Sequence, residues 1–263
     1  MKHVAIVIMS FSFSIAAYAV ETNFDNEMAI GDVTAVSSKP LATVGIVKTV
    51  PLPLVVDANA FYSNITTEAG GNVTNGGATS NITRLVCDDV TYDASAGART
   101  LVGYRFTVTN ANAASVTARA RIRFFQDNSG FPGTLIGGSS LTPLSFPGSS
   151  ANTLHVTLST ALPFPGTGSA VHVWACITFD DNTGGTGGAT GITTAELNNL
   201  GQDFIEPVDR GSSANEYFVT TNPGSFFASN PTGSLVFSSV HNFGWELLQA
   251  TAFPVTLQSF TVD

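Results

Sequence analysis

Residues 116–124 carry the pattern that most limits how this chain can fold. Every second position is apolar, and the positions between are polar or basic. The apolar set is Val116, Ala118, Ala120, Ile122 and Phe124, and the other set is Thr117, Arg119, Arg121 and Arg123. A period of two places the two sets on opposite faces of a β-strand, whereas a helix would mix them. The segment therefore predicts a strand with one face turned to a core.

Several other segments predict strands, and turn residues separate them. Strands are expected at 101–108, 154–158 and 171–179, the last apolar enough to be central, with closing strands at 234–240 and 253–262. Turn-rich residues 63–83 predict a mobile loop, and Asn-Pro-Thr-Gly at 230–233 predicts a turn. One short helix is expected at 194–200, because Thr193 and Glu196 have capping-box spacing. The predicted fold class is all-β: a two-sheet antiparallel β-sandwich, jelly-roll-like, with one short connector helix.

The N-terminal residues predict export and divide the chain into three parts. Residues 1–19 resemble a signal peptide, with a basic start, an apolar run too short to span a bilayer and a small-residue cleavage site. Residues 20–57 predict an N-terminal arm or edge strand, because Pro51 and Pro53 cannot donate to the ladder of a central strand. The arm lies on its own sandwich or is donated to a neighbouring subunit. Residues 58–263 are the predicted β-sandwich domain.

Charge and cysteine content indicate in which compartment the protein works and which classes of partner are excluded. The chain has 10 basic and 19 acidic residues, a net charge of −9. Nucleic acid is therefore not expected as a partner, because its phosphates would be repelled. Cys87 and Cys176 predict one disulfide in an oxidising compartment, with two buried thiols as the alternative. We expect a secreted protein, extracellular or in a bacterial cell envelope, with no transmembrane segment in the mature chain.

Six segments of the chain have strand and turn patterns that resemble those of a known group of proteins. They are residues 61–64, 87–90, 101–110, 123–134, 174–179 and 242–245. Together they resemble a broad group of uncharacterised bacterial exported β-sandwich proteins. The resemblance implies a β-sandwich fold and an extracellular or envelope location. Many members of that group carry a Pro-Glu-Pro C-terminal sorting tail, a motif that is absent here from residues 256–263.

Catalytic motifs are not found in the sequence. It contains neither Gly-x-Ser-x-Gly nor His-Glu-x-x-His. Glycan hydrolysis needs two nearby carboxylates, and the scattered candidates are Glu206, Asp209, Glu216 and Glu246. His172 shares a strand face with Trp174, where a structural histidine is favoured over a general base. We therefore expect no enzyme and no catalytic residue.

Acidic residues near predicted strand ends offer oxygen ligands for calcium. The candidates are Asp88, Asp89, Asp127, Asp180 and Asp181. If Cys87 and Cys176 are neighbours on antiparallel strands, Asp89 and Asp181 lie over about 20 Å apart, so one ion cannot use both. Asp residues also cap turns without metal, and that interpretation is favoured. The expected cofactor is none, with calcium as the alternative.

Five further residues are candidates for a ligand or partner face. Arg119, Arg121 and Arg123 could hold a polyanionic glycan or an acidic patch on another subunit. The favoured interpretation is a solvated face balanced by carboxylates on the next strand. Trp174 and Trp245 are either core anchors or stacking platforms for sugars.

The favoured function is a secreted, non-enzymatic extracellular or cell-envelope protein, structural or adhesive. Its partners would be further copies of itself or other envelope proteins. The alternative is a secreted carbohydrate-binding module that holds polysaccharide and is stabilised by calcium. A glycan hydrolase with dispersed carboxylates is the least favoured of the three, because fold alone does not establish activity.

Overall fold

The structure, a computed structural model, consists mostly of antiparallel β-strands. It describes residues 44–50, 55–78, 81–185, 187–214, 216–220, 229–237 and 242–250, with the backbone alone for 44–50 and 68–70. The predicted signal peptide and the strand expected at 253–262 lie outside these residues. No helix within the described part of the chain is long and apolar enough to cross a membrane.

One sheet has seven strands and is centred on the pair β4 and β10. Its order is β13-β12-β4-β10-β6-β7, and β8 pairs with β6. The strands are β4 (Val86–Tyr92), β6 (Val116–Asp127), β7 (Pro132–Ser140), β8 (Leu144–Phe146), β10 (Val171–Asp180), β12 (Glu216–Thr220) and β13 (Gly233–Phe237). β10 pairs with β4 on one side and β6 on the other, so the prediction of a central strand is confirmed.

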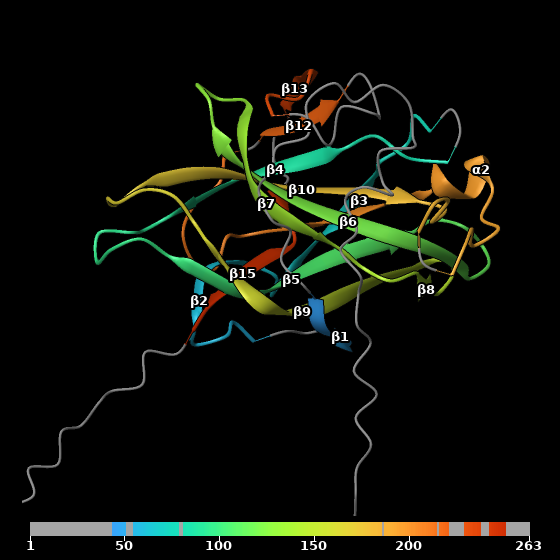
Figure 1. The fold of residues 1–263 in the computed structure, drawn as a ribbon, viewed down its shortest axis with the longest axis horizontal. Helices are drawn as coiled ribbons and strands as arrows, with labels where there is room; N and C mark the ends of the chain where they lie inside the picture. The colour runs from blue at the N-terminus through green and yellow to red at the C-terminus, as the bar shows by residue number, and fades with distance from the viewer. Residues whose placement is uncertain are drawn as a thin grey trace, which may run out of the picture.

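The second sheet has eight strands. Its main order is β1-β9-β5-β11-β14, while β15 joins β2 to β5 and β3 pairs with β11. The strands are β1 (Val44–Val50), β2 (Ala60–Asn64), β3 (Glu68–Thr74), β5 (Thr100–Asn110), β9 (Ser150–Pro163), β11 (Leu200–Ile205), β14 (Asn242–Phe243) and β15 (Trp245–Gln249). In Figure 1, the sheet with β4, β10 and β6 lies over the sheet with β5, β9 and β15. The predicted two-sheet sandwich is confirmed.

The main core lies between the two sheets, and alternation along the strands fills it. The apolar face of β6, predicted from residues 116–124, is buried there from Val116 to Phe124. From the other sheet, Tyr104 and Trp245 pack against Phe124, and Phe106 packs against both of them, with centroids of the contacting rings 5.5–6.3 Å apart. Aromatic rings at these separations add to the hydrophobic stabilisation of the inter-sheet core.

Two local expectations need correction. Helix α2 (Thr194–Leu197) has the predicted capping box, since Glu196 N donates to Thr193 Oγ1 and Thr193 N donates to Glu196 Oε2. It is shorter than predicted, because Leu200 already belongs to β11 and pairs with β5. The loop expected at 63–83 contains strand β3, which pairs with β11. Backbone hydrogen bonding to a distant strand overrides the turn tendency of its glycines.

Strand β1 is an edge strand of the eight-stranded sheet. It pairs with β9 alone, with Val47 opposite Val156 and Lys48 opposite His155. One salt bridge, between Asp57 and Arg105, holds the chain that follows β1 to the same sheet, and Arg105 also pairs with Glu246 of β15. Arg105 on β5 contacts Asp57 at 3.4 Å and Glu246 at 2.9 Å. Arg105 Nη1 also donates to the carbonyl of Val55.

Candidate functional site

The disulfide Cys87–Cys176 organises the outer face of the seven-stranded sheet. The two residues are direct partners in the pairing of β4 with β10, so the predicted disulfide is confirmed. Both cysteines are buried in a small second cluster that includes Trp174, Phe125 and Phe218. Because side chains alternate along β4 and β10, this register decides where the candidate carboxylates and Trp174 lie.

Asp88 and Asp89 are sequence neighbours on opposite faces of β4. Asp88 is fully buried, and its Oδ2 accepts the backbone N–H of Phe243 at 3.1 Å. Burial and the nearby charge of Asp89 raise the pKa of Asp88 well above its usual value. Asp89 is on the outer face, where it accepts hydrogen bonds from Ser213 Oγ and the N–H of Ala214. The two carboxylates therefore do not form one ligand set.

The predicted arginine row (Arg119, Arg121 and Arg123) is not a solvated face. Its three side chains are 6%, 0% and 0% exposed. Arg119 Nε donates to Asp180 Oδ1 at 2.9 Å, and Arg121 Nε bonds Asp180 Oδ2. Arg123 Nη1 donates to the carbonyl of Ser139 at 3.3 Å. Asp180 on the neighbouring strand β10 does balance Arg119 and Arg121, as expected, but these ion pairs are buried.

The calcium candidates separate along β10. Asp89 lies opposite Trp174, whereas Asp181 follows the end of the strand seven residues later, about 23 Å away at the rise of a strand. Asp180 is ion-paired with arginines, and Asp181 binds Thr183 within a turn. Among the residues that the structure describes, no three His, Cys, Asp or Glu side chains are arranged to hold a metal ion. The turn-capping role is the one seen for Asp181.

Asp89 and Asp127 line the same pocket on the outer face, which we call the acidic pocket. It encloses about 240 Å³. The ionisable and aromatic side chains that line it are Asp89, Asp127, His172, Trp174 and Glu216. Asp127 accepts the indole N–H of Trp174 at 3.0 Å and the backbone N–H of Gly130 at 3.1 Å. Burial, with help from the charge of Glu216, raises the pKa of Asp89 to about 6.

Neither tryptophan is an exposed stacking platform. Trp174 is 1% exposed and belongs to the cluster around the disulfide. Trp245 is 0% exposed and packs in the main core, where its ring stacks on Phe106 at 5.5 Å. Of the two interpretations for these residues, the core-anchor role is the one seen.

The scattered carboxylates considered for hydrolysis each serve a local contact. Glu206 binds the amide of Asn242, and Asp209 accepts the backbone N–H groups of Ile65 and Thr66. Glu246 is paired with Arg105, and burial raises its pKa above the usual value. Glu216 alone among them lines the acidic pocket. They do not converge on one site.

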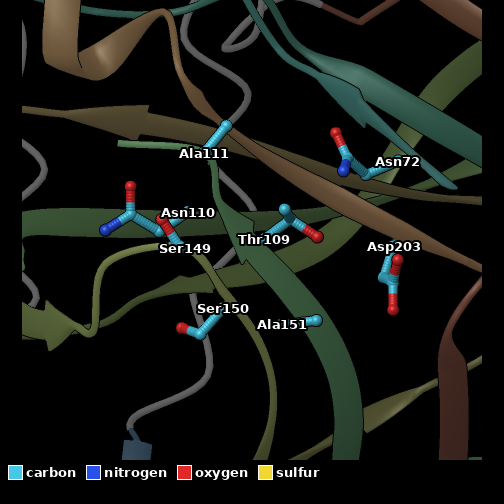
Figure 2. Close-up of a pocket in the computed structure, with 8 residues that line it drawn as sticks. All are labelled: Asn72, Thr109, Asn110, Ala111, Ser149, Ser150, Ala151 and Asp203. Atoms are coloured by element: carbon cyan, nitrogen blue, oxygen red, sulfur yellow. The ribbon is translucent and has the colours of Figure 1, made fainter. Parts of the chain in front are cut away.

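A second pocket, which the sequence patterns did not single out, lies on the eight-stranded sheet. We call it the amide–hydroxyl pocket; it has a volume of about 380 Å³. Its lining is Asn72, Thr109, Asn110, Ala111, Ser149, Ser150, Ala151 and Asp203. Figure 2 shows Asn72 and Asp203 on one side of Thr109, and Asn110 with Ser149 on the other. The residues come from four strands and two loops, so no local sequence motif predicts the pocket.

Long-range strand pairing assembles this pocket. Asp203 of β11 pairs with Asn72 of β3, and Thr109 of β5 pairs with Gly201 of β11 and with Ala151 of β9. A Cβ at Gly201 would overlap the backbone of Val73. Glycine there allows β3 to approach β11, which places Asn72 beside Asp203. The Asn110 amide holds the rim by donating to the carbonyls of Phe146 and Pro147.

Comparison with known proteins adds no relative. No protein-family model, no curated protein and no solved structure matches this chain. The assignment of function therefore depends on the residues and geometry described above.

Proposed function

We propose that this is a secreted, non-enzymatic extracellular or cell-envelope protein, structural or adhesive, that assembles through the β1 edge of its eight-stranded sheet. The observation that carries the proposal is the position of β1. It is the first described strand of the chain, and within the described residues it pairs with β9 alone. The buried disulfide is compatible with an oxidising compartment outside the cytoplasm.

An outermost strand at one end of a chain suits assembly for two physical reasons. Its outer side presents backbone N–H and C=O groups that another strand can pair with. The first strand of the described residues can also be exchanged between copies, because its departure leaves the connectivity of the other described strands unchanged. In either case the contacts are backbone hydrogen bonds along a strand, as in other forms of β-augmentation.

Contacts after β1 limit how far the exchanged segment would extend. Asp57 N donates to Glu246 Oε1 at 2.9 Å, and the Asp57 carboxylate contacts Arg105 at 3.4 Å. Arg105 Nη1 also holds the carbonyl of Val55, so the chain is attached to its own sheet from Val55 onward. If β1 is exchanged, the chain would diverge between Val50 and Val55, and this part of the sequence includes Pro51 and Pro53.

Light scattering on two purified forms tests the proposal. One form begins at Val20, and the other begins at Asp57 and lacks β1. We expect the longer form to be oligomeric and the shorter form to be monomeric and folded, as judged by circular dichroism. If the longer form is monomeric across the concentrations tested, assembly through β1 is excluded.

A cysteine pair distinguishes exchange from edge-to-edge pairing. Lys48 and His155 are directly opposite each other, so K48C/H155C places two thiols within reach across β1 and β9. Exchange predicts crosslinked dimers on a non-reducing gel, because each β1 lies on a partner's β9. Edge-to-edge pairing predicts crosslinks within single chains although the native protein is oligomeric. The single variants K48C and H155C are the controls for nonspecific crosslinking.

A further inference from the structure

We propose that the amide–hydroxyl pocket is a binding site for an uncharged carbohydrate. The pocket is built on β3, β5, β9 and β11 and does not include β1. Binding at this pocket is therefore independent of assembly through β1. A protein that assembles through β1 and binds sugar through this pocket would be adhesive through two separate surfaces.

The central observation is an unsatisfied hydroxyl at the pocket. Thr109 lines the pocket, is 6% exposed, and its Oγ1 has no hydrogen-bond partner within the described residues. Val108 points into the main core, so alternation along β5 turns Thr109 to the opposite face. A buried hydroxyl without a partner costs free energy, which a ligand hydroxyl would recover on binding.

The surrounding groups match the hydrogen-bonding capacity of a sugar. The Asn72 amide can donate and accept, and a carboxylate such as that of Asp203 can accept from adjacent hydroxyls. The hydroxyls of Ser149 and Ser150 line the same pocket. Figure 2 shows the Asn72 amide directed toward the Thr109 side of the pocket, with Asp203 below it in the view. The lining therefore offers both donors and acceptors to the hydroxyls of a sugar.

The same lining argues against other ligand classes. Among the described residues no Lys or Arg lines the pocket and Asp203 is the one acidic side chain there, so phosphates and sulfated glycans are disfavoured. Apolar ligands are disfavoured because the only apolar side chains in the lining are the methyl groups of Ala111 and Ala151. The lining also holds no aromatic ring, so binding relies on hydrogen bonds. We expect dissociation constants on the order of 1 mM for one short oligosaccharide, equivalent to about 4 kcal/mol.

Affinity gel electrophoresis with soluble polysaccharides tests the site. Dextran, laminarin, galactomannan and xyloglucan serve as neutral probes, and alginate serves as the charged probe. The variant T109V removes the unsatisfied hydroxyl with little change in shape, and N72A removes the amide of an exposed residue. The matched control is T153V, because Thr153 is also buried, has an unpartnered Oγ1 within the described residues and lies on adjacent β9 outside the pocket.

We expect at least one neutral polysaccharide to retard the native protein. T109V and N72A should each weaken that binding about fivefold, the effect of one hydrogen bond, whereas T153V should leave it unchanged. Thermal unfolding should show T109V to be at least as stable as the parent protein, since the lost hydroxyl has no partner. No retardation by any neutral probe would overturn the proposal. So would retardation by alginate alone, or binding that T109V and N72A leave unchanged.

Discussion

Cys87 of β4 and Cys176 of β10 are bonded to each other across two strands that are already neighbours in one sheet. The disulfide therefore does not join the two layers of the sandwich. It fixes the register of the central strand pair, and through that register it separates the acidic residues. Asp89 is placed at the acidic pocket, while Asp180 is placed beside the arginine row on β6.

Replacing both cysteines with alanine should destabilise the protein by about 4 kcal/mol. The bond closes a loop with a sequence separation of 89 residues, which removes much conformational entropy from the unfolded chain. Urea unfolding of C87A/C176A, followed by tryptophan fluorescence, measures the change. The parent protein unfolded in reductant is the matched control, and it should approach the stability of the variant. Equal stability of oxidised parent and variant would contradict the prediction.

The variant D180N should lose about 3 kcal/mol of stability. Asp180 is 1% exposed and contacts both Arg119 and Arg121, so its removal leaves two buried guanidinium groups without that counter-charge. The adjacent residue supplies the control, because Asp181 is partly exposed and contacts Thr183 in a turn. We expect D181N to cost less than about 1 kcal/mol. Similar losses in the two variants would show that the buried pairing is not the cause.

The free energy of unfolding should fall as the pH rises from about 4 to 6. Burial raises the pKa of Asp89 from 3.8 to about 6, so the folded state holds this proton at pH values where the unfolded chain has released it. The contribution of Asp89 is at most about 3 kcal/mol, from a shift of about two pKa units.

The variant D89N isolates this effect, because asparagine stays neutral and keeps a hydrogen-bond acceptor for Ser213 or Ala214. The stability of D89N relative to the parent protein should therefore rise between pH 4 and pH 7. Denaturant midpoints measured across that range give the comparison. Parallel stability curves for the two proteins would show that Asp89 titrates with an unshifted pKa.

Phenylalanine should be tolerated better at position 245 than at position 174. Both tryptophans are buried, but Trp174 Nε1 donates to Asp127, whereas Trp245 Nε1 has no acceptor among the described residues. Loss of a hydrogen bond to a carboxylate adds about 1–2 kcal/mol to the cost of the smaller ring. Urea unfolding of W174F and W245F measures the difference. A larger loss for W245F would show that ring packing, not hydrogen bonding, dominates at these sites.

Strand positions were predictable from local patterns because burial on one face imposes a period of two. The alternating apolar positions of β6, from Val116 to Phe124, face the main core, and the apolar segment at 171–179 is the central strand. The capping box at Thr193 was also readable, since its two hydrogen bonds are local. β3 was not, because its pairing with β11 joins residues far apart in the sequence.

The alternating sequence pattern of β6 could not predict that its arginine side chains are buried. Thr117 and the arginines of β6 have the spacing of a solvated face, and a buried carboxylate on β10 decides otherwise for Arg119 and Arg121. The same holds for Trp174 and Trp245, whose composition allows either a core or a surface role. Alternation shows which side chains share a face, but it does not show whether another part of the chain covers that face.

Local chemistry thus specified the fold class, the strands with strong alternation, the helix start and the disulfide partners, because each depends on near neighbours or on a single residue pair. The two pockets depend on sheet order and register. Asp89, Asp127 and Glu216 line one pocket from three different strands, and Thr109 lies in the other pocket with Asn72 and Asp203 through the pairing of β5, β11 and β3. Those pairings arise from the hydrogen bonding of distant segments, which no local window of the sequence contains.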